Sequence, residues 1–144
     1  MMKRYNVIWI DDEWEKQKSF IEFCNVKHKI NITPFKNSKD GMHELENNIS
    51  KWDAVILDAK VYDKSDDEIA SLKGLMSSIK KIESLNSKKK VPYFISTGQP
   101  DLLSDSNFKE LHGKFYSKET DDEELIDDLK IAADNQIETQ IRHK

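Results

Sequence analysis

Five short apolar segments alternate with longer amphipathic segments along this chain, and this alternation constrains the fold more than any other feature. The apolar segments are residues 5–10, 30–35, 54–57, 91–96 and 114–117. Between them, apolar residues recur at three- and four-residue steps, which predicts helices, as in the series Ile69, Leu72, Met76 and Ile79. Because right-handed crossovers join parallel strands, five strand–helix repeats predict an α/β fold, a doubly wound five-stranded parallel sheet with helices on both faces.

The length and composition of the chain predict a single domain over residues 1–144. A chain of 144 residues can bury a hydrophobic core without disulfides or a structural metal, and 37% of its residues are hydrophobic. No internal repeat and no linker rich in glycine, proline or serine divides it. Thr120 and Glu123 form the pattern of a capping box, which predicts a C-terminal helix near 120–141.

Charge and cysteine content exclude several classes of protein. The 23 basic and 27 acidic residues give a net charge of −4, whereas nucleic-acid-binding domains carry a clustered positive excess. The single cysteine, Cys24, fits a reducing compartment. No apolar run approaches the roughly 18 residues of a membrane helix. We therefore predict a cytoplasmic protein that binds neither nucleic acid nor membrane directly.

Carboxylates gather where two of the predicted strands end. Asp11, Asp12 and Glu13 follow the first strand, and Asp58 ends the third. Ligands of open α/β sheets bind beyond the carboxyl ends of the strands, so these side chains are predicted to meet. Converging carboxylates repel one another unless a cation joins them, and donors that are all oxygen favour Mg²⁺.

The fourth and fifth strands add a hydroxyl and a positive charge at the same edge. Thr97 ends the fourth strand, and Lys118 follows the fifth. A lysine and a hydroxyl beside a metal-binding cluster suit a phosphoryl group, because its negative oxygens need cations and hydrogen-bond donors. The pattern therefore predicts phosphoryl-transfer chemistry at this edge of the sheet.

Four motifs give the sequence a family resemblance. "VIWIDDE", "DAVILDAK", "YFISTG" and "FYSK" occur in this order, each at the end of a different predicted strand. With them the chain resembles the receiver domains of bacterial two-component response regulators, from Tyr5 to about Ile137. The resemblance implies a flavodoxin-like (βα)5 fold. It also implies a signalling domain that takes a phosphoryl group from a histidine kinase or phosphotransfer protein and switches protein–protein interactions. Such a domain catalyses only its own phosphorylation and dephosphorylation.

The resemblance also implies a role for each residue at the metal site. Asp58 would be the phospho-accepting carboxylate. Asp12 and Asp58 would bind Mg²⁺ directly, together with the backbone carbonyl of Lys60. Asp11 would reach the ion through water.

Three further residues would sense the phosphoryl group. By the same resemblance, Lys118 would neutralise its charge and Thr97 would bond one of its oxygens. Movement of Thr97 would repack the fourth helix and the fifth strand, where Phe115 holds the aromatic switch position. Phe115 lacks a tyrosine hydroxyl, so its switching would be steric.

Two features depart from the family pattern. Glu119 follows the lysine, where the family usually has a proline in a cis bond. The segment near 60–73 is longer than usual and acidic, and we expect residues 62–69 to form a flap beside the site.

The face formed by residues 101–111, the fifth strand and the last helix is expected to mediate association, as a symmetric homodimer, although its charges also suit a plain solvated surface.

Two other functions fit parts of the pattern. A degenerate receiver would act as an interaction module independent of phosphorylation. A small Mg²⁺-dependent phosphatase of the haloacid-dehalogenase kind would also use an aspartyl nucleophile, but it needs a second carboxylate two residues later, where Lys60 stands. P-loop and dinucleotide-binding folds are excluded because neither glycine pattern is present.

Overall fold

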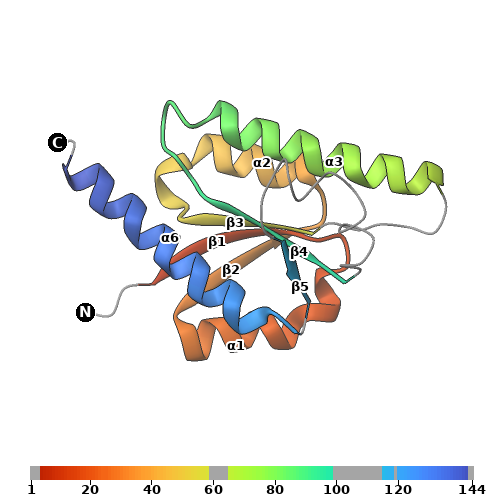
Figure 1. Ribbon diagram of the computed structural model, residues 1–144, viewed down its shortest axis with the longest axis horizontal. Helices are drawn as coiled ribbons and strands as arrows, with labels where there is room; N and C mark the ends of the chain where they lie inside the picture. The colour runs from red at the N-terminus through yellow and green to blue at the C-terminus, as the bar shows by residue number, and fades with distance from the viewer. Residues whose placement is uncertain (1–3, 59–64, 99–114, 119, 143–144) are drawn as a thin grey trace.

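The computed structural model shows strands and helices in the alternating order that the sequence predicts (Figure 1). It describes residues 4–58, 65–98, 115–118 and 120–142. The strands are β1 (Tyr5–Ile10), β2 (Ile30–Phe35), β3 (Ala54–Asp58), β4 (Tyr93–Thr97) and β5 (Phe115–Ser117). The helices are α1 (Lys18–His28), α2 (Ser38–Asn47), α3 (Ser65–Ser84) and α6 (Asp122–Arg142), with 3-10 turns η1 (Trp14–Gln17) and η2 (Ile49–Lys51).

The five strands form one parallel sheet in the order β2-β1-β3-β4-β5, which confirms the predicted doubly wound architecture. The strand order reverses between β1 and β3, and such a switch point opens a crevice at the carboxyl ends of the two strands. Ile10 of β1 pairs with Leu57 of β3, so the residues that follow each of them are neighbours. The register therefore brings Asp11 beside Asp58.

Helices cover both faces of the sheet, with α2 and α3 on one side and α1 and α6 on the other (Figure 1). Alternate side chains of β1 serve the two cores, because successive residues of a strand point to opposite faces. Ile8 and Ile10 pack in the α2/α3 core, whereas Val7 and Trp9 pack in the α1/α6 core. Each fully buried side chain of this size contributes about 1.5–3 kcal/mol. No helix within the described residues is long and apolar enough to span a membrane.

A glycine sets the distance between α2 and the sheet. A Cβ atom placed on Gly41 would lie 2.8 Å from both Cγ1 and Cδ1 of Ile10. The helix itself begins where the Asn37 side chain accepts a hydrogen bond of 2.8 Å from the Asp40 amide. The cap and the glycine together fix how α2 lies over the end of β1.

Two local expectations concern the starts of helices. Residues 65–69, expected within a flap, are helical and begin α3, whereas residues 62–64 of that segment lie outside the described residues. The cap of α6 also differs: the carbonyl of Asp121 accepts the first intrahelical bond from Leu125 N–H at 2.9 Å, so Asp121 takes the place predicted for Thr120. Lys60, residues 101–111 and Glu119 lie outside the described residues.

Candidate functional site

Three carboxylates converge at the carboxyl ends of β1 and β3. One oxygen from each of Asp11, Asp12 and Asp58 lies within 4.8 Å of the others. Asp11 is 2% exposed, the side chain of Asp58 is 4% exposed, and Asp12 faces solvent. The register of the two strands thus produces the cluster that the sequence predicts, with one open side.

Lys118 at the end of β5 joins two of these carboxylates. Its Nζ lies 2.9 Å from Asp11 Oδ2 and 2.9 Å from Asp58 Oδ1. Burial lowers the pKa of the Lys118 ammonium, but the charge of Asp58 and hydrogen bonds to Asp58 and Asp11 outweigh this effect, and the pKa lies above its ordinary value. Lys118 thus contacts two carboxylates of the cluster although Glu119, not proline, follows it in the sequence.

Backbone hydrogen bonds hold Asp11 in place. Its N–H donates to the Phe35 carbonyl at 2.9 Å, and its own carbonyl accepts from Trp14 N–H at 3.2 Å. Its Oδ1 accepts from Glu13 N–H at 2.8 Å, while its Oδ2 accepts from Lys118. Both carboxylate oxygens of Asp11 are thus bonded to protein donors.

The donor set fits a hard divalent cation. Three carboxylates carry three negative charges, and Lys118 supplies one positive charge among them. All the candidate ligand atoms are oxygens, which Mg²⁺ prefers. The exposed side of the cluster, at Asp12, leaves an approach from solvent.

Thr97 ends β4, and Phe115 begins the neighbouring strand β5. Thr97 is fully buried at the end of β4, and its carbonyl accepts from Lys118 N–H at 2.8 Å. Phe115 begins β5 and packs against the α2/α3 core. The structure thus brings Thr97 to the carboxyl edge of the sheet, whereas Phe115 lies at the opposite end of β5, paired with Ile95.

Tyr116 is a residue of this region that the sequence interpretation did not single out. It follows Phe115 but points to the opposite face, where its hydroxyl donates to Asp128 Oδ2 of α6 at 2.6 Å. Burial and the bond to Asp128 raise the pKa of Tyr116. The alternation of β5 indicates the face on which Tyr116 lies, but no sequence pattern identifies Asp128 as its partner.

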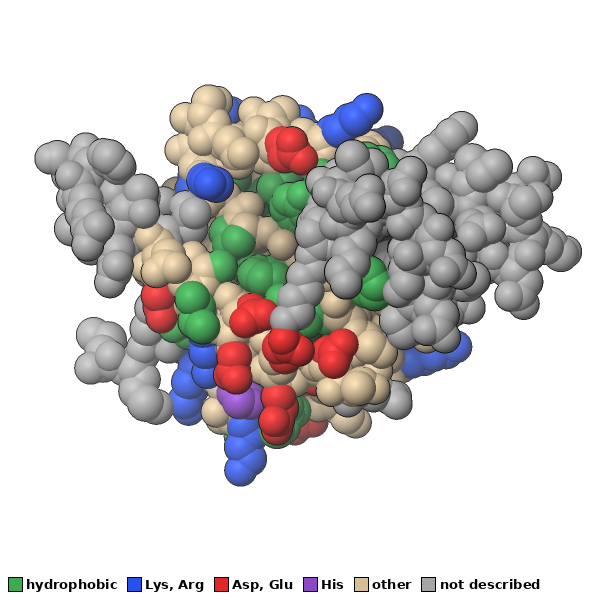
Figure 2. All heavy atoms as spheres, in the orientation of Figure 1, with side chains coloured by type: hydrophobic (Ala, Val, Ile, Leu, Met, Phe, Trp, Pro, Cys, Tyr) green, Lys and Arg blue, Asp and Glu red, His purple; other side chains and the backbone are tan. Residues whose placement is uncertain are grey.

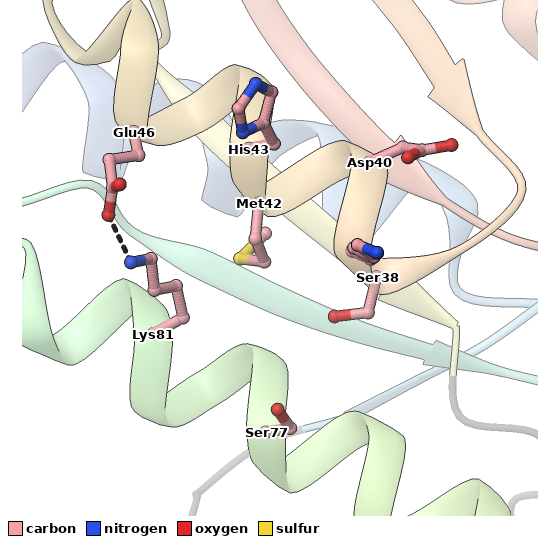
Figure 3. Close-up of a pocket in the computed structure, with 8 residues that line it drawn as sticks. Ser38, Asp40, Met42, His43, Glu46, Ser77 and Lys81 are labelled. Carbon is pink, nitrogen blue, oxygen red and sulfur yellow. Dashed lines mark ion pairs between the residues drawn. The ribbon is translucent and has the colours of Figure 1, made fainter.

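Two surface features lie apart from the cluster. The exposed acidic side chains of α6 gather on one face of the molecule (Figure 2); they are Glu123, Glu124, Asp127 and Asp134. A groove of about 710 Å³ runs between α2 and α3. In Figure 3, Met42, Ser77 and the Glu46–Lys81 ion pair line this groove, and none of its lining residues belongs to the carboxylate cluster.

Comparisons with known proteins identify the fold. No family model matches the sequence, and a search of curated proteins finds no relative. Among solved structures, the chain is similar to a signal receiver domain from Vibrio parahaemolyticus, with 16% identity, a TM-score of 0.65 and 99% of both chains covered. It is similar to a response regulator receiver domain protein from Clostridium thermocellum, with 20% identity, a TM-score of 0.61 and coverage of 97% of this chain and 99% of that one.

A third similar structure is a phosphorylated cyanobacterial phytochrome response regulator, with 15% identity, a TM-score of 0.56 and coverage of 95% of this chain and 96% of that one. In each case the match extends over nearly the whole chain. The chain therefore has the fold of response regulator receiver domains.

Proposed function

We propose that this receiver-fold chain is a phospho-accepting signalling domain that takes a phosphoryl group onto Asp58. The observation that supports this most is the convergence of Asp11, Asp12 and Asp58 at the switch point of the sheet, with the Lys118 ammonium 2.9 Å from two of them. A nucleophilic carboxylate, a fixed cation and an oxygen-lined metal site are the parts that phosphoryl transfer needs. The likeness to a response regulator in its phosphorylated form supports the same function.

The side chains present suit each part of the transfer. A carboxylate oxygen of Asp58 attacks the phosphorus of a phosphohistidine; the P–O bond forms as the P–N bond breaks, and the imidazole leaves. Lys118, held beside Asp58, neutralises charge on the phosphoryl oxygens. Thr97 bonds one of these oxygens. Thr97 is fully buried at the end of β4, and its movement toward the phosphoryl group is the proposed switch.

Asp12 and Asp58 are the residues proposed to hold Mg²⁺ directly, with the Lys60 carbonyl as a further ligand. Both oxygens of Asp11 are bonded to protein donors, which favours contact with the ion through water. A bound Mg²⁺ would supply positive charge close to the phosphoryl oxygens. The chain's own contribution is to fix the three carboxylates, through the β1–β3 register and the hydrogen bonds around Asp11.

The proposal implies partners of two kinds. The phosphoryl donor is a histidine kinase or a phosphotransfer protein in the cytoplasm. The output is a change in protein–protein contact through β5, the outer side of α6 and residues 101–111, the last of which lie outside the described residues. Exposed carboxylates of α6 gather on one face of the molecule (Figure 2). A symmetric homodimer through this face is the simplest form of that output.

Phosphorylation in vitro tests the proposal. The protein is incubated with acetyl phosphate and Mg²⁺ and analysed by intact mass. We expect one added phosphoryl group, lost in Asp58→Asn and retained in Asp127→Asn, a matched change of an exposed carboxylate on α6. Undiminished labelling of Asp58→Asn would overturn the assignment. A folded wild-type protein that takes up neither phosphoryl group nor beryllofluoride would instead be a phosphorylation-independent interaction module.

A further inference from the structure

A pair of reciprocal hydrogen bonds closes the turn that carries Lys118. Ser117 N–H donates to Asp121 Oδ2 at 2.8 Å, and Asp121 N–H donates to the Ser117 carbonyl at 2.9 Å. Two hydrogen bonds thus join Ser117, which precedes Lys118, to Asp121, which precedes α6. On the sheet side, Lys118 N–H donates to the Thr97 carbonyl at 2.8 Å. The backbone from which the Lys118 side chain starts is held from both directions.

Asp121 also ties this turn to α6. Its carbonyl accepts from Leu125 N–H at 2.9 Å, which is the first bond of the helix. Leu125 and Leu129 are 2% and 1% exposed in the core between α6 and the sheet, so the start of the helix is firmly seated. A side chain in the N-cap position commonly bonds to the helix it precedes. The Asp121 carboxylate instead reaches back to the strand and links two well-packed elements through one residue.

We infer that Asp121 is a positioning residue, whose carboxylate fixes the β5–α6 turn so that the Lys118 ammonium lies between Asp58 and Asp11. This inference rests on the proposed function. A lysine side chain has four flexible carbon–carbon links, and two contacts of 2.9 Å require a well-defined backbone origin. Without the Asp121 carboxylate, Ser117 N–H loses its partner. Only the bond from Asp121 N–H to the Ser117 carbonyl then holds the turn.

Two simpler roles for Asp121 make different predictions. If it only stabilised the start of α6, its loss would lower stability without acting through Lys118. If it acted only by its negative charge, an asparagine would behave like an alanine. A positioning role predicts that asparagine retains function, because its amide oxygen can still accept from Ser117 N–H.

The test measures the initial rate of Mg²⁺-dependent labelling by acetyl phosphate. We expect Asp121→Ala to slow labelling about tenfold, the kinetic equivalent of one lost hydrogen bond. Asp121→Asn should stay within about threefold of wild type, which is less than half of that free energy, and Glu22→Ala, a change of an exposed carboxylate on α1, should match wild type. In a Lys118→Ala background, Asp121→Ala should have no further effect, since the residue acts through Lys118. An undiminished effect in that background would overturn the inference, as would an Asp121→Asn variant as slow as Asp121→Ala.

A second measurement does not depend on phosphorylation. Brief acetylation of the metal-free protein by an amine-reactive ester, followed by peptide mass spectrometry, compares Lys118 with Lys16, whose side chains are 17% and 74% exposed. We expect slow modification of Lys118 in wild type and in Glu22→Ala, and several-fold faster modification in Asp121→Ala. Unchanged protection of Lys118 in folded Asp121→Ala would overturn the positioning role. Wild-type protein that is never labelled would overturn the proposed function, and the acetylation result would still decide the role of Asp121.

Discussion

Replacing Asp12 by asparagine should stabilise the metal-free protein and weaken its response to Mg²⁺. Asp12 is the exposed member of the cluster, and its carboxylate lies within 4.8 Å of those of Asp11 and Asp58. Lys118 contacts the other two carboxylates. Neutralising Asp12 therefore removes two like-charge repulsions and also removes a proposed metal ligand, while the side chain keeps nearly its original shape.

The size of each effect follows from the geometry. Two unit charges separated by 4.8 Å repel by about 0.9 kcal/mol in a water-like dielectric and about 3.5 kcal/mol at an effective dielectric of about 20. Because Asp12 faces solvent, the lower value applies to each of the two pairs, and we expect a gain of about 1–2 kcal/mol at low ionic strength. With Mg²⁺ at about 100 times its Kd, wild type gains about 2.7 kcal/mol, whereas a variant with about 100-fold weaker affinity gains about 0.4 kcal/mol. The order of stability should therefore reverse when Mg²⁺ is added.

Urea unfolding at pH 7, followed by circular dichroism with and without Mg²⁺, measures both effects. NaCl at matched ionic strength separates binding from screening. Asp127→Asn removes an exposed carboxylate away from the cluster and should leave the Mg²⁺ response unchanged. If Asp12→Asn is less stable than wild type without metal, the three carboxylates do not repel one another as argued. If the variant gains as much stability from Mg²⁺ as wild type does, Asp12 is not a ligand of the ion.

Two further predictions concern packing and pH. Gly41→Ala should lower the unfolding free energy by about 1–2 kcal/mol, because the new Cβ overlaps Ile10 and the gain in helix propensity offsets only part of the strain. The control is Gly98→Ala, whose new Cβ meets nothing within 4 Å and should cost little stability in the same urea experiment. Burial and a hydrogen bond to a carboxylate raise the pKa of Tyr5 from 10.0 to about 12, so its contribution to stability is complete below pH 10 and is lost as the pH rises toward 12. Unfolding between pH 9 and pH 12 should show a shallower loss of stability in Tyr5→Phe and Tyr116→Phe than in wild type, and equal slopes would contradict this.

The architecture and the composition of the site are readable from the sequence because both depend on local pattern and on topology. Periods of two and of three to four residues identify strands and helices, and the rule for parallel crossovers arranges them in one sheet. Residues at the carboxyl ends of β1, β3, β4 and β5 must then meet at one edge, which is why the sequence groups Asp11, Asp58, Thr97 and Lys118.

Element boundaries depended on interactions that the pattern does not specify. Asp66, Asp67 and Glu68, three of the acidic residues expected in a flap, lie in the first turn of α3, where negative charge is favourable. The capping-box pattern at Thr120 competes with Asp121 one residue later, and the observed first bond of α6 selects Asp121. Signals of similar strength at neighbouring positions are resolved only by how the helix packs.

The sequence by itself determined the α/β class, the parallel sheet and the identity of the groups at its carboxyl edge. Only the tertiary structure decided which groups bond to one another: Lys118 with Asp11, 107 residues apart, Tyr116 with Asp128 across the α6 interface, and Asp121 with Ser117 across the turn. The physical reason is that periodicity acts within a segment and requires only the type of each residue. A hydrogen bond between distant side chains requires their positions to within a few tenths of an ångström, and those positions exist only once both cores are packed.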